Sequence, residues 1–150
     1  MKSTVSNPKE KLNSIVRIAP VCNGKIYVVP RPSEDGKIRM DLPIEEAVEQ
    51  VSTSSNRIAC KIKEKYSRHI CCTASPRLSV QYRSAPHNGS TVYLYILPLE
   101  KENEIHFLNG EFIDSQEITI EPQKYSSNLQ EEGELLGMAA ELWADYLCGE

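Results

Sequence analysis

The chain has 150 residues and a mass of 16.9 kDa, with 40% hydrophobic and 25% charged residues, which are ordinary proportions for one globular domain. Its 17 Lys and Arg residues against 21 Asp and Glu residues give a net charge of −4, which argues against non-specific binding to nucleic acid or anionic membranes. No stretch approaches the ~20 apolar residues of a membrane span, and the polar N-terminus has no signal-peptide core. We therefore expect a flexible leader over residues 1–13, a single domain over residues 14–150 and a cytoplasmic location.

The first predicted elements form a hairpin. Two apolar runs, at residues 15–21 and 25–30, are separated by Asn23-Gly24, and both residues of this pair tolerate the positive φ angles of a tight turn. The pattern predicts two antiparallel strands. A loop at residues 32–36 and a short extended run at residues 37–42 follow.

An amphipathic helix is predicted next, after an acidic and then Ser/Thr-rich segment. Ile58, Ile62 and Tyr66 recur every four residues and form one apolar stripe, while Ser54 or Ser55 suits the N-cap. The opposite face carries charged side chains, from Lys61, Lys63, Glu64 and Lys65.

The second half of the chain predicts more strands and a final helix. The strand-like runs lie at residues 70–73, 77–83, 91–97, 105–108 and 111–113, with hairpin turns at residues 85–89 and at Asn109-Gly110. Residues 121–131 look like a polar linker. The order of strands, helix, strands and helix predicts an α+β fold with a mixed or antiparallel sheet packed by helices.

The final helix has two apolar stripes. We expect the first to face the core, and it contains Leu135, Ala139, Leu142 and Tyr146. The second stripe lies at the edge of the first and contains Leu136, Trp143 and Leu147. If this second stripe is exposed, the helix would instead mediate a homodimer.

The five cysteines have no spacing that predicts a metal or disulfide site. They are Cys22, Cys60, Cys71, Cys72 and Cys148, and none forms a Cys-x-x-Cys pair. We expect them to be small buried hydrophobic residues, with the neighbours Cys71 and Cys72 on opposite faces of a strand. The histidines His69, His87 and His106 are equally dispersed.

The stretch from Gly36 to Ile70 resembles a Nudix domain. Met40-Asp41-Leu42-Pro43 is similar to the aromatic-Asp-Leu-Pro approach of that family, and the helix ending at Ser67 takes the place of the helix in its box, G-x5-E-x7-R-E-U-x-E-E-x-G-U, where U is a bulky aliphatic residue. The resemblance extends over residues 16–147. It implies a Nudix-like fold, a mixed sheet packed between helices, and hydrolysis of a pyrophosphate held by Mg²⁺.

The box departs from the family pattern where the metal would bind. Aligned on the helix, Lys61 and Lys65 occupy glutamate positions and Glu64 keeps the one matching carboxylate. The position of the loop glutamate holds Ser52 or Val51. Mg²⁺ requires hard oxygen ligands, and at about 4 Å in a medium of effective dielectric ~20 each unit-charge repulsion costs about 4 kcal/mol. We therefore expect no metal site of the family's kind and no cofactor, with Glu64 as a catalytic remnant at most.

The leading hypothesis is a Nudix-like domain that has lost pyrophosphohydrolase activity and binds a nucleotide-like ligand or a protein partner. In the family arrangement, the side chains nearest an anion would be those of Arg31, Arg39, Lys61 and Lys65. One alternative is an unorthodox hydrolase of nucleoside diphosphate-type substrates, with Mg²⁺ held by Glu45, Glu46, Glu49 or Glu64. Another is a structural subunit of a larger assembly. The sequence thus favours a protein without enzymatic activity and leaves a Nudix-type pyrophosphohydrolase as the alternative.

Overall fold

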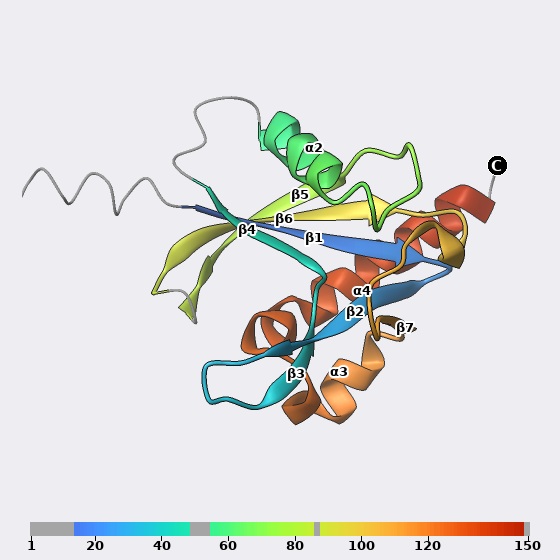
Figure 1. Ribbon diagram of the computed structural model, residues 1–150. Helices are drawn as coiled ribbons and strands as arrows, with labels where there is room; N and C mark the ends of the chain where they lie inside the picture. The colour runs from blue at the N-terminus through green and yellow to red at the C-terminus, as the bar shows by residue number, and fades with distance from the viewer. Residues whose placement is uncertain (1–13, 49–54, 86–87, 149–150) are drawn as a thin grey trace, which may run out of the picture.

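A computed structural model describes residues 14–48, 55–85 and 88–148 of the chain (Figure 1). The strands are β1 Ser14–Cys22, β2 Lys25–Pro32, β3 Ile38–Asp41, β4 Ile44–Val48, β5 Arg77–Ser84, β6 Ser90–Pro98 and β7 Glu111–Ile113. The helices are α2 Ser55–Lys65, α3 Gln116–Ile120 and α4 Ser127–Cys148, with 3₁₀ turns at Glu102–Glu104 and Pro122–Lys124. The predicted leader over residues 1–13 lies outside the described residues.

The sheet is built around β1. One edge of β1 pairs in parallel with β6 along its whole length, and β5 then pairs antiparallel with β6. The other edge of β1 is shared between β4, which pairs antiparallel with its first half, and β2, which pairs only beside the hairpin. Beyond the hairpin β2 diverges and pairs with β3 and β7. Parallel and antiparallel pairs in one sheet confirm the predicted mixed α+β architecture.

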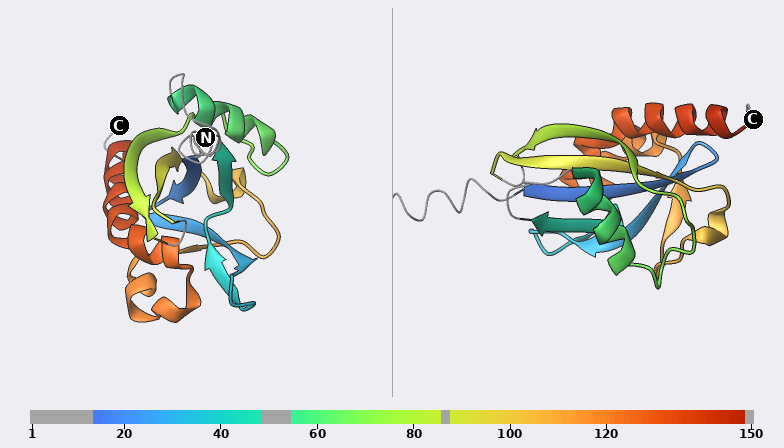
Figure 2. Two further views of the ribbon diagram at one scale, coloured as in Figure 1. Left: turned by 90° about the vertical axis from the view of Figure 1, so that its left-hand side faces the viewer. Right: turned by 90° about the horizontal axis from the view of Figure 1, so that it is seen from above.

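Helices cover both faces of this sheet (Figure 2). Because successive strand residues point to opposite faces, Val16 and Ile18 join the core under α2, whereas Ala19 and Val21 join the core under α4. Arg17 lies between Val16 and Ile18 and therefore points to the α4 side, where its side chain is fully buried.

The first hairpin and the amphipathic helix α2 are confirmed. Asn23 and Gly24 adopt φ angles of 53° and 79° at the turn between β1 and β2. Along α2, Ile62 is buried and Ile58 packs against the same core, as the apolar stripe predicts. The short extended run before Pro43 forms β3.

Two strand predictions in the second half are wrong. Residues 70–73 and 105–108 form only one isolated bridge, between Ile70 and Ile105. The backbone of Phe107 bonds to a side chain instead of a neighbouring strand. The Tyr27 hydroxyl accepts a hydrogen bond from the Phe107 amide at 2.9 Å and donates to its carbonyl at 3.2 Å. β7, expected to pair back across Asn109-Gly110, pairs with β2 instead. Cys71 and Cys72 consequently lie outside any strand, Cys71 exposed and Cys72 half-buried.

The chain between Pro43 and α2 also contains a strand that its acidic sequence did not predict. β4 carries Glu45 and Glu46, and both carboxylates have cationic partners in the fold. Their charge is therefore compensated by contacts distant in sequence rather than by solvent, which is why local composition does not reveal the strand.

The linker predicted at residues 121–131 is wrong as well. α4 begins at Ser127, after Ser126 accepts a hydrogen bond from the Leu129 amide at 3.1 Å as an N-cap residue does. Two polar side chains near its start are buried: Asn128 and Glu132 are 5% and 2% exposed. A composition-based linker prediction fails because these polar groups are hydrogen-bonded inside the protein.

The two stripes predicted for the final helix are partly exchanged. Leu136 is fully buried, whereas Leu142, expected in the core, is 59% exposed. Leu135 and Ala139 are half-buried. The side chains of Trp143, Tyr146 and Leu147 lie outside the described residues. No helix in the described part of the chain combines the length and apolar character needed to cross a membrane.

Candidate functional site

The end of α2 is tied to β4 by a carboxylate that serves two partners. Lys65 Nζ lies 3.0 Å from Oε1 of Glu46, and the Tyr66 hydroxyl donates to Oε2 of the same side chain at 2.5 Å. The Tyr66 hydrogen bond lowers the pKa of Glu46, with the Lys65 contacts acting in the same direction. Burial, together with the Glu46 carboxylate, raises the pKa of Tyr66 to about 12. At neutral pH Glu46 and Lys65 therefore form an ion pair, and the protonated Tyr66 hydroxyl is hydrogen-bonded to the Glu46 carboxylate.

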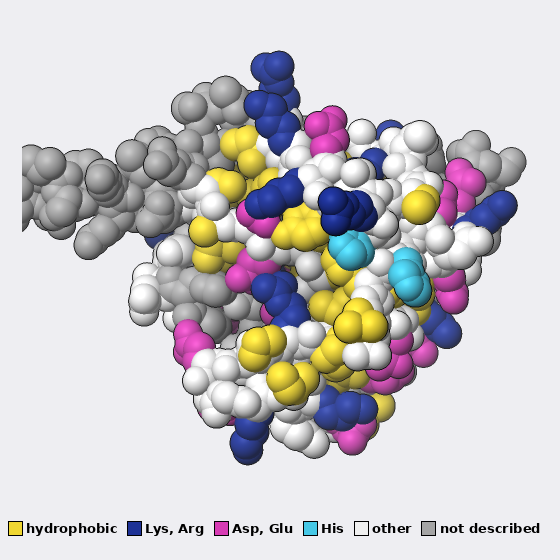
Figure 3. Space-filling view, in the orientation of Figure 1, with side chains coloured by type: hydrophobic (Ala, Val, Ile, Leu, Met, Phe, Trp, Pro, Cys, Tyr) yellow, Lys and Arg dark blue, Asp and Glu magenta, His cyan; other side chains and the backbone are white. Residues whose placement is uncertain are grey.

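The other charged residues of α2 face solvent. Lys61 and Glu64 are exposed, as is the amino group of Lys65 beyond its ion pair. Lys63 turns back instead and donates to the carbonyl of Ala74. Figure 3 shows dark blue cationic side chains over α2, with hydrophobic side chains gathered on the face below it. Aromatic rings contribute to that surface: Tyr66 and His69 both contact Phe107.

This donor set does not fit the magnesium ion that a Nudix-like fold implies. In the alignment expected from the sequence, two of the three helix positions for box carboxylates hold Lys61 and Lys65. In the structure both oxygens of Glu46 already accept hydrogen bonds. Within the described ranges no group of three His, Cys, Asp or Glu side chains is arranged to hold a metal ion. Glu49 and the loop position at Val51 or Ser52 lie outside those ranges.

On the opposite face of the sheet, Arg17 gathers three carboxylates. Its guanidinium binds Glu132 in a bidentate contact, at 2.7 and 2.8 Å, and reaches Asp41 at 2.8 Å and Glu45 at 2.5 Å. These partners come from α4, β3 and β4. Tyr82 of β5 donates to Glu132 at 2.6 Å, so the cluster joins four other elements to the central strand.

Burial and the guanidinium act in opposite directions on the carboxyl groups. Burial raises the pKa of Glu132 above its ordinary value, and Arg17 and Tyr82 offset only part of that effect. For Asp41 burial is the largest effect and favours the neutral form, but the Arg17 charge and the hydrogen bonds from Arg17, Leu42 and Ser126 together outweigh it, so the pKa is lowered. Asp41 and Glu45 are partly exposed, at 14% and 21% of their side chains, and they connect the buried cluster to a pocket above it.

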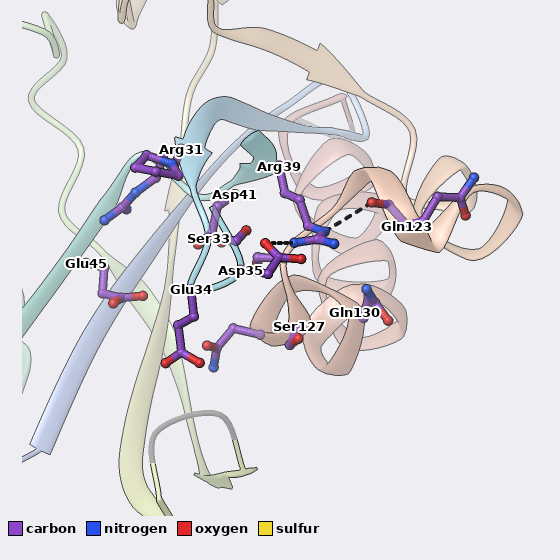
Figure 4. A pocket seen from close by; sticks show the side chains of 13 residues that line it. Arg31, Ser33, Glu34, Asp35, Arg39, Asp41, Glu45, Gln123, Ser127 and Gln130 are labelled. Carbon is purple, nitrogen blue, oxygen red and sulfur yellow. Dashed lines mark hydrogen bonds and ion pairs between the residues drawn. The ribbon is translucent and has the colours of Figure 1, made fainter. Parts of the chain in front are cut away.

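That pocket, which we call the hairpin pocket, lies between the β2–β3 loop and the first turn of α4 (Figure 4). Its volume is about 440 Å³, within the usual size range of small-molecule sites. The hairpin side contributes Arg31, Pro32, Ser33, Glu34, Asp35 and Arg39; the α4 side contributes Gln123, Ser126, Ser127, Asn128 and Gln130; and Asp41 and Glu45 complete the lining.

The two arginines of the hairpin pocket differ in their partners. Arg31 and Arg39 are cross-strand neighbours in the β2–β3 pair. Arg39 binds Asp35 at 2.8 Å and the carbonyl of Gln123 at 3.3 Å, which Figure 4 shows as dashed lines. Arg31 donates to the carbonyl of Leu42 at 3.0 Å and forms no ion pair with a described carboxylate. Its positive charge is therefore the less compensated of the two.

The structure thus separates the predicted site residues into two places. Arg31 and Arg39 line the hairpin pocket, whereas Lys61 and Lys65 do not, and Lys65 pairs with Glu46. Sequence reasoning did not predict the cluster of Arg17, Asp41 and Glu132, and it named Asp41 only as part of the motif before Pro43. A lone arginine in the apolar run 15–21 was the one signal that could have indicated a buried ionic cluster.

Comparison with solved structures identifies the fold. The chain is similar to a Nudix hydrolase from Nitrosomonas europaea (TM-score 0.54, 13% identity, covering 86% of this chain and 90% of that one). It is also similar to the Ap4A hydrolase of C. elegans (TM-score 0.56, 11% identity, covering 87% and 98%). A third likeness is to the C-terminal domain of mouse MUTYH in its complex with human PCNA (TM-score 0.57, 8% identity, covering 86% and 89%). No protein-family model matches the sequence, and no curated protein matches it significantly. The chain has a Nudix-like fold.

Proposed function

We propose that this chain is a Nudix-fold binding domain that does not cleave pyrophosphates by the metal-dependent route of Nudix hydrolases, and that its ligand is nucleotide-like. The observation that carries the proposal is the ion pair of Lys65 with Glu46, 3.0 Å long and supported by Tyr66. It places an ammonium group at the junction of α2 and β4, where the resemblance calls for metal-binding carboxylates.

The charge of this junction opposes a divalent cation. An ion beside Glu46 would meet Lys65 directly and would have to displace a hydrogen bond from Tyr66. Glu64 is the one carboxylate that the helix keeps at a box position, and it is exposed. A single solvated carboxylate cannot compensate for the repulsion between the ion and the ammonium groups.

The hairpin pocket supports a small ligand with two kinds of polar group. Arg31, which lacks a carboxylate partner among the described residues, offers charged hydrogen bonds to an anion. Asp41 and Glu45 line the pocket with carboxylates that already bind Arg17, and a carboxylate can accept further hydrogen bonds from N–H groups. A nucleotide carries both features, a phosphate and a base with N–H donors. The pocket therefore suits a nucleotide-like ligand better than an apolar one.

The alternative of an unorthodox hydrolase has weaker support. Of the carboxylates it requires, Glu45 contacts Arg17 and Glu46 contacts Lys65 and Tyr66. A protein partner is the second candidate ligand, and the MUTYH domain with human PCNA is an example of a similar fold in a protein complex. A purely structural role is favoured only if the hairpin pocket binds no small molecule.

Titration with ADP while amide chemical shifts are recorded tests the binding proposal. We expect the largest shifts at Arg31, Ser33 and Ser127, and an affinity about tenfold lower for Arg31→Ala, because charged hydrogen bonds are lost. Arg83→Ala is the matched control, since the Arg83 side chain is exposed and donates to the Gly89 carbonyl of its own hairpin, outside the pocket lining. Shifts confined to other surfaces, or equal affinity of Arg31→Ala and the control, would refute the assignment of the ligand to this pocket.

A further inference from the structure

An apolar groove runs between the second half of α4 and the outer strands of the sheet. It has a volume of about 340 Å³, and its seven lining residues are all apolar: Val80, Leu94, Ile96, Leu135, Met138, Ala139 and Leu142. Met138 and Leu142 lie one turn apart and are 65% and 59% exposed. Isolated exposed apolar residues are normal on a protein surface, but here two of them border a continuous apolar depression.

The groove is open because of the position of β5. α4 packs over β1, β2 and β6, while β5 is the last strand of the sheet and pairs only with β6 among the described residues. Both views of Figure 2 show β5 beside α4 at this edge of the molecule. No described element lies on the outer side of β5, so a second molecule can approach the groove from there.

Charges of opposite sign border the two walls of the groove. Arg77 pairs with Ile96 across β5 and β6, so it shares the face that lines the groove, and it is exposed. On α4, Glu134 and Glu141 flank Met138 and are also exposed. None of these three side chains forms an ion pair with a described residue. One wall is thus positive and the other negative.

We propose that this groove is the interface of a homodimer in which two copies are related by a twofold axis. Met138 and Leu142 of each copy enter the groove of the other, and Arg77 of each copy faces Glu134 and Glu141 of the other. A twofold contact is self-complementary, so it satisfies both walls at once. A partner segment of uniform charge would meet like charge on one wall. This inference does not depend on the proposed ligand of the hairpin pocket.

Sedimentation equilibrium over a range of protein concentrations tests the dimer. We expect the wild type to dimerise and Leu142→Glu to weaken the dimer about tenfold or more, because a charge would be buried in the apolar contact. Ile120→Glu is the matched control, since Ile120 on α3 is 71% exposed and does not line the groove. A wild type that stays monomeric at millimolar concentration, or a dimer that Leu142→Glu leaves intact, would overturn the proposal.

Charge reversal distinguishes a twofold pair from any other contact. Arg77→Glu and Glu141→Arg should each weaken self-association, because each places like charges opposite one another twice. Mixed together, the two variants should form a heterodimer more readily than either forms a homodimer, since both contacts between positions 77 and 141 then join opposite charges. A mixture that associates no better than the separate variants would overturn the proposed geometry.

Discussion

The carboxylate of Glu46 joins β4 to the end of α2. Its two oxygens accept hydrogen bonds from Lys65 and Tyr66, which are 19 and 20 residues away in the sequence. The expectation that Lys61 and Lys65 stand at glutamate positions of the Nudix box, and that metal ligands are therefore missing, comes from the sequence. The partner of Lys65 is not visible there, because β4 was not predicted as a strand and its position beside α2 follows from the sheet.

Tyr66→Phe should raise the pKa of Glu46 toward its ordinary value, because the hydrogen bond that most lowers it is removed. A carboxyl group with a lowered pKa contributes stability above its unfolded pKa and loses it as the pH falls through its folded pKa. The variant should therefore lose less stability than the wild type on acidification. Carbon-detected NMR titration of the Glu46 carboxyl checks the shift. An unchanged pKa would mean that Tyr66 does not control this carboxylate.

Among the secondary-structure elements, those with regular apolar periodicity were predicted correctly. Segments whose polar side chains are buried and hydrogen-bonded were not. α2 and the β1–β2 hairpin follow from their patterns, and the structure confirms both. The start of α4 was hidden because Asn128 and Glu132 are buried among hydrogen-bond partners, which come from β1 and β5. The sequences around Cys71 and Phe107 have strand-like composition, but they share only the Ile70–Ile105 bridge, and Phe107 bonds to the Tyr27 hydroxyl instead of a neighbouring strand.

Gly137 of α4 is predicted to be required for the close approach of α3. A Cβ at this position would lie 2.3 Å from Oγ and 2.9 Å from Cβ of Ser115. Although alanine is the better helix former by about 1 kcal/mol, overpacking costs about 1–3 kcal/mol, so we expect Gly137→Ala to lower the free energy of unfolding. Urea denaturation measures it. In a Ser115→Gly background the same change should become neutral or stabilising; a loss that persists there would place its cause elsewhere.

Restoring carboxylates to α2 should create metal affinity. In Lys61→Glu/Lys65→Glu, Glu64 gains two neighbouring carboxylates and Glu46 loses its ammonium partner, so we expect Mn²⁺ to bind more tightly than to the wild type. Lys25→Glu/Lys124→Glu changes the net charge equally at sites away from α2 and is the control. Isothermal titration calorimetry compares the three proteins. Equal Mn²⁺ affinity in all of them would show that the helix is wrongly aligned with the Nudix box.

At the scale of the whole molecule, the buried cluster of Arg17 holds the layers together. Its carboxylate partners are 24, 28 and 115 residues away in sequence, on β3, β4 and α4. The fold class and the Nudix-like architecture could be predicted from element order, because that order reflects local patterns. The cluster could not, since it depends on which distant strands meet β1.

Arg17→Met should destabilise the fold by about 3–5 kcal/mol, because it leaves buried carboxylates without their cation. Burial already raises the pKa of Glu132, and the loss of Arg17 should raise it further. A raised carboxyl pKa gives stability at low pH that is lost as the pH rises through it, so the variant's deficit should be larger at neutral than at acidic pH. Urea unfolding against pH measures this, with Arg83→Met as the exposed control. A deficit independent of pH would contradict the assignment to Glu132.

The proposed function requires that the junction of α2 and β4 does not support metal-dependent hydrolysis. Phosphate or nucleotide release from a panel of nucleoside and sugar diphosphates, in the presence of Mg²⁺ or Mn²⁺, tests it most directly. We expect release no faster than in protein-free samples, both for the wild type and for Glu64→Gln. Turnover by the wild type that disappears in Glu64→Gln would contradict it and would establish Glu64 as part of a working site.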